Sequence, residues 1–479
     1  MNLTAKKHRS FLYFITIVAV IRLFLAPHVG LGVDEAHYVL YALNLDLSYF
    51  DHPPLVGWIQ YVFTSVFGTN EFGARVAAIA IGFITSIFVY RLIYGIENNA
   101  KYAFIAVLAL HASFLFNALF IMLMPDTLLF LLMIPIIFAV IRIEKENSLK
   151  NWLILGVLLG LAGLSKYTAV LFIVPIVLYV IIRKRYELFY TPKLIPAVLV
   201  ALAIISPVLI WNIQNGWSSF SYQSEHVVGA NSINWGGYFQ SLGAQFGAYN
   251  PFLFPLAFYG LYKALYSRNP TLLLSGLFGI VLISFFTYAA LYKTALPHWS
   301  ALFYMLFIPI GSYYALQAGE KLKSYLYFAI GFGLLLSAVA YAELGFKFIP
   351  QKDYQSLHRD IYGWDTIMKK ANKYVKTPSK EALAVTNWTL ASRAIYYNRN
   401  YNSEVFLIDK RDDQFDIWEK EQAIGKDLIV INTHFFKKDI DKYMQCDEVK
   451  TLENFDIILH DNKVNSIKLT MCKNFQGLR

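Results

Sequence analysis

Long apolar runs alternate with short polar connections from Phe11 to about Phe346. A helix needs about 17–25 mostly apolar residues to cross a bilayer, and eleven runs reach or approach that length. The pattern therefore predicts a polytopic α-helical membrane domain over residues 1–349, with about eleven transmembrane helices. The runs are 11–27, 73–94, 102–121, 124–142, 152–164, 168–182, 195–211, 251–266, 271–290, 299–316 and 325–346.

The tail, residues 350–479, has a different pattern. Strand-like runs (ALAVTN, VFLID, DLIVIN, FDIILHD and VNSIKLTM) alternate with the helical stretch TLASRAIYY, which predicts a soluble α/β domain. Both cysteines of the chain, Cys446 and Cys472, lie in this tail. In an oxidising compartment they could form a disulfide, and two free thiols are the alternative.

Charge adds an orientation to this picture. Only 15% of the residues are charged, against about 25% in ordinary soluble proteins. The net charge of +10 comes from Lys and Arg that gather in every second connection, as the positive-inside rule requires. We therefore expect a cytoplasmic N-terminus, a periplasmic tail and no nucleic-acid partner. The first apolar run is too long, and lacks a small-residue cleavage site, for a removed signal peptide.

The first outer loop, about residues 28–72, holds the densest polar cluster. Its stretch from Gly32 to Leu55 contains acids and histidines but no Lys or Arg. Within it, AHYVLYALNLDL has apolar residues at helical spacing, which predicts a short helix lying along the membrane interface with its apolar face down. Arg22, inside the first apolar run, is expected to face the bundle interior and a carboxylate. The polar side chains of the stretch are Asp34, Glu35, His37, Asp46, Asp51 and His52.

The other polar exceptions fall on the same predicted side. Asp126 lies in a tight turn, Lys166 lies between two apolar runs, and Arg75 and Lys293 lie at helix edges. A transporter usually keeps its charges near the membrane midplane between repeats, and the sequence shows no convincing inverted repeat. The distribution favours a reaction site fed by a lipid in the outer leaflet, with a transporter or lipid flippase as the alternative.

Five motifs carry a resemblance to a known family. Asp34-Glu35 directly after the first run, then SYFDHPPL, MPD, GLAGLSKYTAVL and LPHWSALFY, resemble membrane glycosyltransferases of the GT-C class. The most similar groups are bacterial aminoarabinose transferases of lipid A, protein O-mannosyltransferases and related lipopolysaccharide sugar transferases. The resemblance implies a bacterial inner-membrane enzyme that transfers a monosaccharide, with inversion, from a polyprenyl-phosphate donor to a glycan, glycolipid or protein hydroxyl in the periplasm.

The chemistry of that reaction assigns roles to the acids. Phosphate is already an adequate leaving group, so the site needs cations on the phosphate and a carboxylate that takes the acceptor's proton. Asp34 matches the family's acid on the first loop and is our predicted base, and Asp126 matches a second acid of related enzymes. Glu35 is expected either to orient the site or to bond backbone amides at the start of the short helix.

The predicted phosphate ligands are the scarce cations of the outer side and their neighbours. A Lys between two spanning helices is costly unless it meets an anion, and the alternative for Lys166 is a structural pair with an outer acid. In aminoarabinose-transferase-like relatives the positions of His37 and His52 tend to hold Arg and Lys. A divalent metal bound by these two histidines and nearby acids is a further alternative. No cofactor is otherwise expected, and we expect a monomer. The predicted ligands are Lys166, Tyr167, Arg75, Lys293, His37 and His52.

Overall fold

The computed structural model describes residues 6–228, 232–419 and 423–479. The chain forms two compact units, each of which draws on more than one stretch of sequence. The first unit comprises residues 1–24, 46–59 and 75–341, and the second comprises residues 25–45, 60–74 and 342–479. The predicted boundary near residue 349 lies close to residue 342, but two early segments, 25–45 and 60–74, join the C-terminal unit.

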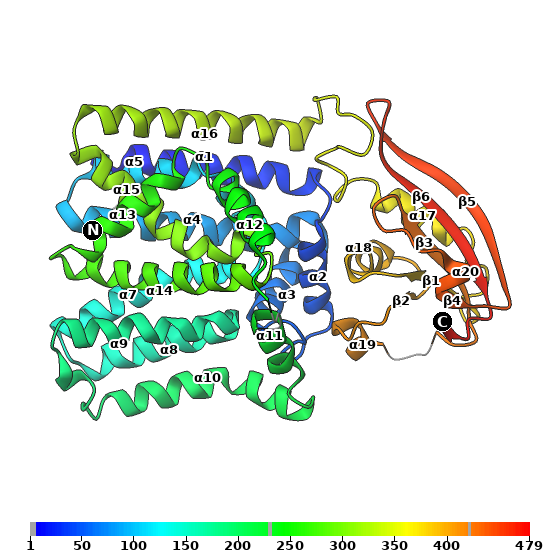
Figure 1. Ribbon diagram of the computed structural model, residues 1–479, viewed down its shortest axis with the longest axis horizontal. Coiled ribbons are helices and arrows are strands. Elements are labelled where there is room, and N and C mark those ends of the chain that lie inside the picture. Colours follow the sequence, from blue (N-terminus) through cyan, green and yellow to red (C-terminus); the bar gives the residue numbers. More distant parts are fainter. Residues whose placement is uncertain (1–5, 229–231, 420–422) are drawn as a thin grey trace. The chain divides into compact units, whose positions relative to one another are not determined.

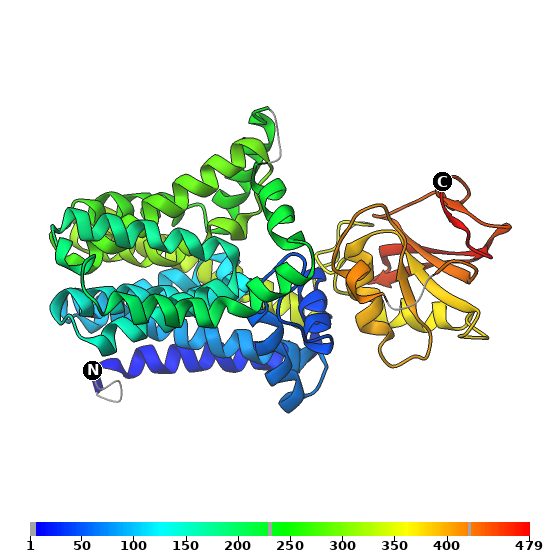
Figure 2. The same cartoon turned by 90° about the horizontal axis from the view of Figure 1, so that it is seen from below.

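The first unit is a helix bundle whose long helices run roughly parallel to one another (Figures 1 and 2). In the described ranges, seven helical segments are long and apolar enough to cross a membrane: Lys6–His28, Glu71–Glu97, Pro125–Lys145, Leu194–Gln214, Pro270–Tyr292, Pro297–Gln317 and Glu320–Phe346. The predicted runs at 102–121, 152–164, 168–182 and 251–266 form shorter helices, so the count of about eleven spans is not confirmed. The helices with residues in this unit are α1 (Arg9–Leu25), α3 (Leu55–Phe67), α4 (Glu71–Glu97), α5 (Ala100–His111), α6 (Phe114–Leu119), α7 (Pro125–Lys145), α8 (Leu149–Ser165), α9 (Ile173–Ile182), α10 (Leu194–Gln214), α11 (Ser218–Val228), α12 (Trp235–Ala248), α13 (Phe254–Leu265), α14 (Pro270–Tyr292), α15 (Ala301–Gln317) and α16 (Glu320–Phe346).

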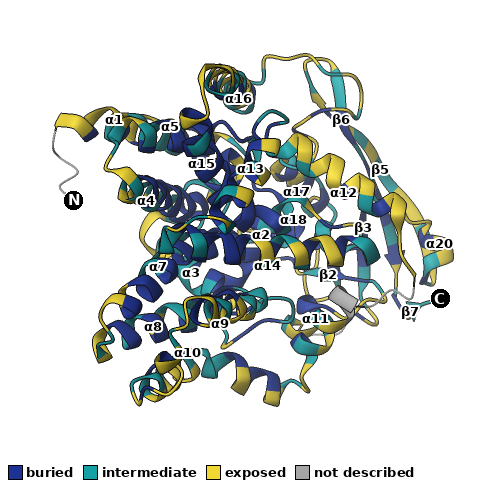
Figure 3. Ribbon diagram, turned by 60° about the vertical axis from the view of Figure 1, so that its left-hand side comes forward, coloured by how far each residue is buried: buried dark blue, intermediate teal, exposed yellow. Residues whose placement is uncertain are grey.

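Two helices form the centre of the bundle. In the most apolar stretch of each helix, 78% of the residues of α7 and 89% of those of α15 are buried inside the protein, against 17% for α10. Figure 3 shows this contrast. Small residues allow close packing at the centre: a Cβ on Gly311 of α15 would lie 1.9 Å from the carbonyl oxygen of Leu256 in α13. Such close backbone approach is typical of membrane helices, which lack a hydrophobic driving force between them.

Arg22 is buried in the bundle, as expected, but its partners differ from the expectation. Its Nε donates to the Tyr341 hydroxyl at 2.8 Å, and one terminal nitrogen donates to the Asn117 side-chain oxygen at 3.0 Å. The same nitrogen lies 3.3 Å from Nδ1 of His111. The expectation of a carboxylate partner is therefore wrong, because neutral groups of α5, α6 and α16 hold the guanidinium within the described part of the chain.

The second unit contains a five-stranded sheet in the order β2-β1-β3-β6-β5. Strand β1 pairs in parallel with β2 and β3, whereas β3 with β6 and β6 with β5 are antiparallel, which confirms a C-terminal sheet region. The strands are β1 (Glu381–Val385), β2 (Val405–Leu407), β3 (Asp427–Thr433), β4 (Met444–Gln445), β5 (Glu448–Leu459), β6 (Asn462–Lys473) and β7 (Gly477–Leu478), and the helices are α2 (Val33–Leu43), α17 (Trp364–Asn372), α18 (Trp388–Asn398), α19 (Gln414–Trp418) and α20 (Ile440–Tyr443). Cys446 and Cys472 form a disulfide.

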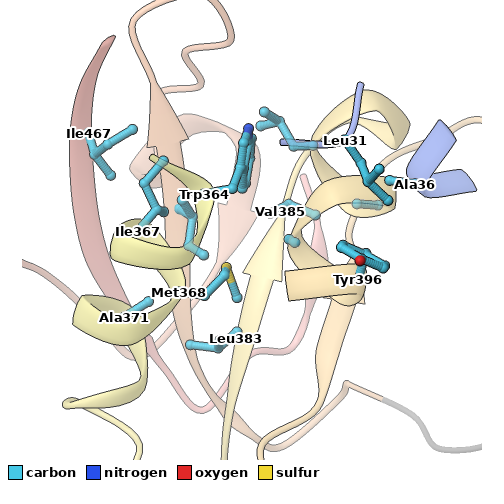
Figure 4. Packing of buried hydrophobic residues seen from close by; sticks show 14 of the residues in the cluster. Leu31, Ala36, Trp364, Ile367, Met368, Ala371, Leu383, Val385, Tyr396 and Ile467 are labelled. Carbon is cyan, nitrogen blue, oxygen red and sulfur yellow. The ribbon is translucent and has the colours of Figure 1, made fainter. Parts of the chain in front are cut away.

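Helix α2 packs into the core of this unit, which the sequence pattern did not predict. Its Ala36, Val39 and Leu40 belong to one buried cluster with residues of α17, α18 and the sheet, and Figure 4 shows Leu31 and Ala36 among them. The predicted short helix exists, but the expectation that its apolar face lies down along the membrane is wrong, because protein already covers that face. Other members of the cluster are Trp364, Ile367, Met368, Leu383, Val385, Leu390, Ala391, Ala394 and Tyr396.

Candidate functional site

Asp126 and Lys166 form an ion pair in the first unit. Lys166 follows the last residue of α8, and Asp126 lies in the first turn of α7. The Lys166 Nζ donates to both carboxylate oxygens of Asp126, at 2.8 and 2.7 Å, and the two side chains are 15% and 4% exposed. An ammonium group has three donors, so one donor of Lys166 makes no bond with a described residue and can meet an anion placed beside the pair.

The next residue, Tyr167, lies among buried polar groups, several of which make no hydrogen bond with a described residue. The Tyr167 hydroxyl lies within interaction range of Ser48, Asn212 and Ser219, but it makes no hydrogen bond of good geometry with a described residue. Buried polar groups are nearly always satisfied by protein or water, so a concentration of unsatisfied groups beside an ion pair is what a polar ligand site requires. Within the described ranges, the atoms without a partner are Oγ of Ser48, the hydroxyl of Tyr167 and Oδ1 of Asn212, together with Oγ1 of Thr168 and Oγ of Ser218, which neighbour Tyr167 and Ser219 in sequence.

An apolar cavity of about 620 Å³ leads to the same place. It is lined mainly by α8 and α10, and residues of the segment 167–173 and of α11 complete it, from Trp152 and Leu194 at one end to Tyr167, Phe220 and Gln223 at the other. Its walls are almost entirely apolar, so the cavity suits a hydrocarbon chain. A chain that lay in it would end near the unsatisfied polar atoms and Lys166.

The segment 46–54 of the first loop is tied to the end of α10 and to α11. Trp211 Nε1 donates to Oδ2 of Asp46 at 2.8 Å, Ser219 Oγ donates to the carbonyl oxygen of Tyr49 at 2.8 Å, and Gln223 donates to the carbonyl oxygen of Asp51 at 2.7 Å. Burial raises the pKa of the Tyr49 phenol above its ordinary value. Three hydrogen bonds therefore fix this part of the loop against segments that lie about 170 residues later.

Two further residues of this segment come together. The His52 Nδ1 lies 3.7 Å from Oδ2 of Asp51, and both side chains are about one-fifth exposed. His52 also contacts the backbone carbonyl of Asp51. The predicted phosphate ligand His52 is thus paired with a carboxylate and remains accessible.

The acids Asp34 and Glu35 lie at the start of α2, in the second unit. Asp34 is partly exposed in the first helical turn, where the helix dipole favours a negative charge. Glu35 is buried, and its Oε2 accepts a hydrogen bond from the backbone N–H of Gly32 at 3.0 Å. Glu35 therefore makes the backbone bond that was one of its two expected roles.

His37 is enclosed by aromatic rings of the second unit. The imidazole is 5% exposed, and its Nδ1 lies 3.3 Å from Oγ of Ser392. Rings from α2, α18 and α19 lie 4.9–6.0 Å from it, between centroids. These contacts make His37 part of the packing between α2 and the C-terminal sequence. The rings are Tyr38, Tyr41, Trp388, Phe415 and Trp418.

Arg75 and Lys293 lie at helix ends in the first unit. Arg75 is 2% exposed near the start of α4, and Lys293 is the C-cap residue of α14, with its backbone N–H bonded to the carbonyl of Ala289. In the described residues, no three His, Cys, Asp or Glu side chains gather as a metal site would require. The predicted residues that the structure brings together are thus Asp126, Lys166 and Tyr167.

The sequence analysis missed the polar groups of α10 and α11 that complete this site. Trp211 and Asn212 end a strongly apolar run, and the hydroxyls of Ser218 and Ser219 are common in any loop. The importance of Trp211 and Ser219 arises from their hydrogen bonds to Asp46 and Tyr49, which no local pattern encodes. The aromatic character of the second outer loop was the available signal, although its residues 229–231 lie outside the described part.

Comparisons with known proteins agree on one class. Residues 51–211 match the family described as dolichyl-phosphate-mannose-protein mannosyltransferase. A lipid A galacturonosyltransferase, RgtD of Rhizobium johnstonii, is 28% identical over 250 residues, which are half of this chain and half of that protein. The chain thus matches only about half the length of this curated relative.

The fold is similar to that of ArnT from Cupriavidus metallidurans. The structure of ArnT bound to undecaprenyl phosphate gives a TM-score of 0.66 at 15% identity, and the match covers 96% of this chain and 98% of ArnT. The apo structure gives a TM-score of 0.65 with the same coverage. Together these findings identify a multi-pass helical membrane protein and confirm its predicted resemblance to the GT-C membrane glycosyltransferases.

Proposed function

We propose that this protein transfers a monosaccharide from a polyprenyl-phosphate donor to an acceptor in the bacterial periplasm, with inversion at the anomeric carbon. The observation that carries the proposal is the apolar cavity that ends beside Tyr167, the unsatisfied polar atoms and the Lys166–Asp126 pair. A hydrocarbon groove that leads to a cation and to unsatisfied donors matches the two halves of a lipid phosphate.

A phosphate oxygen of the donor accepts a hydrogen bond from the third N–H group of the Lys166 ammonium. The two other N–H groups of the Lys166 ammonium donate to Asp126, which holds the ammonium group in place. Tyr167 and Ser48 donate hydroxyl hydrogens to the phosphate oxygens. These groups stabilise the charge that develops on the leaving phosphate. Arg75, Lys293 and the imidazole of His52 are the further groups of the first unit that we assign to the donor, whereas His37 is left out because aromatic rings enclose it.

Asp34 acts as the base. The acceptor hydroxyl attacks the anomeric carbon, its proton passes to the Asp34 carboxylate, and the bond between the anomeric carbon and the phosphate oxygen breaks to release polyprenyl phosphate. Asp34 is suited to this role because it is partly exposed, while Glu35 is committed to the Gly32 amide. The known relatives guide the choice of substrates: ArnT binds undecaprenyl phosphate, and RgtD is a lipid A galacturonosyltransferase.

The location follows from the charge pattern. We place the protein in the bacterial inner membrane with a cytoplasmic N-terminus, and we place the C-terminal unit in the periplasm, where the Cys446–Cys472 disulfide is stable. The acceptor is then a glycolipid, lipopolysaccharide or protein hydroxyl on that side. The chemistry needs no cofactor beyond the donor.

The test uses the full chain, purified in detergent, with short-chain polyprenyl-phosphate monosaccharides and crude envelope acceptor. We expect wild type to release polyprenyl phosphate and to label the acceptor, and Asp34→Asn to lose both while it still binds donor. Asp461→Asn, in an exposed turn between β5 and β6, is the matched control and should keep full activity. Lipid movement in liposomes without any new bond would refute the proposal in favour of a flippase.

A further inference from the structure

One face of the C-terminal sheet changes from apolar to polar along its strands. Directly paired residues of neighbouring strands lie on the same face. Thr470 of β6 pairs with Val430 of β3 on one side and with Thr451 of β5 on the other. The next row on this face consists of Asn432, Lys468 and Asn454.

The apolar end of this face is covered, and the polar end is hollow. Val430 and Cys472 pack with Ile440 of α20 and with Met444 in a buried cluster. The polar rows line a cavity of about 730 Å³, which lies within the range of about 300–1,000 Å³ that is usual for ligand sites. The segment 437–441 forms its wall.

This wall is fixed in place. The side-chain amide of Asn432 donates to the carbonyl oxygen of Lys438 at 2.9 Å, and its oxygen accepts from the Lys438 N–H at 3.3 Å. The backbone N–H of Thr433 donates a further hydrogen bond to the carbonyl oxygen of Phe436 at 3.1 Å. The cavity is therefore preorganised, which lowers the entropic cost of binding.

The floor of the cavity offers polar groups that no described residue uses. The side chains of Thr451, Asn454 and Lys468 make no hydrogen bond within the described residues, and the buried Oγ1 of Thr470 has no partner there. Hydroxyl, amide and ammonium groups side by side on one face of a sheet suit a ligand that carries many hydroxyls.

The free charges of the cavity are mainly positive. Two of its three aspartates pair with lysines that do not line it: Asp439 with Lys442 at 3.4 Å, and Asp456 with Lys463 at 2.8 Å. Of the three lysines that line the cavity, Lys438 lies over the Tyr443 ring at 4.6 Å, and Lys437 and Lys468 make no ion pair with a described residue, which leaves Asp441 as the one lining aspartate against these lysines. A bound ligand should therefore carry an acidic group.

We propose that this cavity binds an acidic saccharide, a sugar that bears a phosphate or a carboxylate. Lys468 bonds the acidic group from the centre of the floor, and Thr451, Asn454 and Thr470 bond the hydroxyls. The inference rests on the proposed function in one respect: the saccharide is the acceptor glycan of the transfer reaction, and the C-terminal unit recruits it.

Binding is measured on the full chain in detergent, without donor, by calorimetric titration. The probes are a glucosamine disaccharide that carries one phosphate, the same disaccharide without phosphate, and a galacturonic acid disaccharide. We expect both acidic probes to bind at least about tenfold more tightly than the neutral one, because a hydrogen bond to a charged group is worth about a tenfold change in affinity or more. Lys468→Gln should weaken the acidic probes by about tenfold and leave the neutral probe unchanged.

Lys450→Gln is the matched control. Lys450 lies on β5 beside Thr451, but it pairs with Met471 on the opposite face of the sheet, so its removal should leave binding unchanged. Asn454→Ala should weaken acidic and neutral probes alike. Equal binding of acidic and neutral probes, or an unchanged affinity in Lys468→Gln, would overturn the inference.

The transfer assay separates this inference from the proposed function. If the phosphorylated probe binds through Lys468 but no donor yields product, the glycosyltransferase proposal fails and the saccharide site stands. If transfer proceeds with the same acceptor KM in wild type and Lys468→Gln, the saccharide site fails alone. The inference predicts an acceptor KM raised about tenfold with kcat unchanged, which a purely structural effect would not produce.

Discussion

The indole Nε1 of Trp211 donates a hydrogen bond of 2.8 Å to the carboxylate of Asp46, 165 residues earlier in the chain. Trp211 is 1% exposed at the end of α10, and Asp46 begins the loop that leads to Asp51 and His52. The pair therefore couples the end of the helix that lines the apolar cavity to the loop beside it.

Trp211→Phe tests this coupling. The variant keeps an aromatic ring but removes the donor, and a hydrogen bond to a charged group is worth about 1.5–3 kcal/mol. We expect a lower unfolding temperature and a raised donor KM, because the loop 46–54 loses one of the hydrogen bonds that hold it against α10 and α11. Trp217→Phe, at a half-exposed indole, is the control; equal effects in both variants would show that ring volume, not the bond to Asp46, is responsible.

The Lys166–Asp126 pair predicts an asymmetric response to mutation. Lys166→Met leaves a buried carboxylate unpaired, and breaking a buried pair costs about 3–5 kcal/mol. The double variant Lys166→Met with Asp126→Leu removes both charges and should recover much of that stability, measured by thermal unfolding in detergent.

Activity should not recover with stability in the double variant. The proposed phosphate contact of Lys166 is absent from both variants, so release of polyprenyl phosphate should stay at least a hundredfold below wild type if the ammonium stabilises the transition state by about 3 kcal/mol. Full activity in the stable double variant would refute the phosphate role and leave the pair with a structural one.

Asp413 predicts a pH dependence of stability. Burial raises the pKa of this carboxyl to about 6, and the nearby carboxylates of Asp416 and Asp409 add to the effect, while the bond from the Phe415 N–H opposes it. Because the folded form binds the proton more tightly than the unfolded form, this group stabilises the fold below about pH 4, and the contribution is lost as the pH rises through about 6.

Asp413→Asn should remove that dependence. Asparagine caps a helix as well as aspartate, so the bond to Phe415 survives and only the buried charge is lost. We expect a higher unfolding temperature than wild type at pH 7.5 and a flatter profile between pH 4 and 6. An exposed neighbour, Asp412→Asn, should change neither, and a lower stability of Asp413→Asn at pH 7.5 would contradict the assignment.

The disulfide predicts a sensitivity to reductant. Cys446 and Cys472 close a loop of 26 residues that joins the start of β5 to the end of β6. Removing a disulfide of this loop length costs about 3 kcal/mol. Cys446→Ser with Cys472→Ser should therefore lower the unfolding temperature and make it independent of dithiothreitol, whereas reductant should lower that of wild type to the same value.

Much of the architecture could be predicted because a membrane-spanning helix can be recognised from one continuous stretch of sequence. An apolar run has to reach a fixed length, and each of the seven long helical segments coincides with a predicted run. The polar exceptions Asp126 and Lys166 were visible for the same reason, since each interrupts an apolar background. Their pairing was one of the alternatives that the sequence left open.

The remaining features depend on contacts between distant segments. Helix α2 has the apolar spacing of an interfacial helix, and the sequence gives no sign that α18, about 350 residues later, covers its apolar face. His37 was predicted as a phosphate ligand because the sequence does not show that rings of α18 and α19, far along the chain, enclose it together with those of α2. Arg22 was expected to need a carboxylate, yet a phenol, an amide and an imidazole together supply its hydrogen bonds.

The burial of α2 in the C-terminal core also has a consequence for biosynthesis. Residues 33–43 leave the ribosome among the first, but the helices and strands that cover them are among the last to be made. During translation the C-terminal residues that pack against α2 have not yet been made, so its apolar face is exposed to water or lipid or is bound by a chaperone until they emerge. The proposed catalytic base thus takes its final position only after α18 and α19, in the last fifth of the chain, have been synthesised, so a chain that stops before α18 cannot assemble this site.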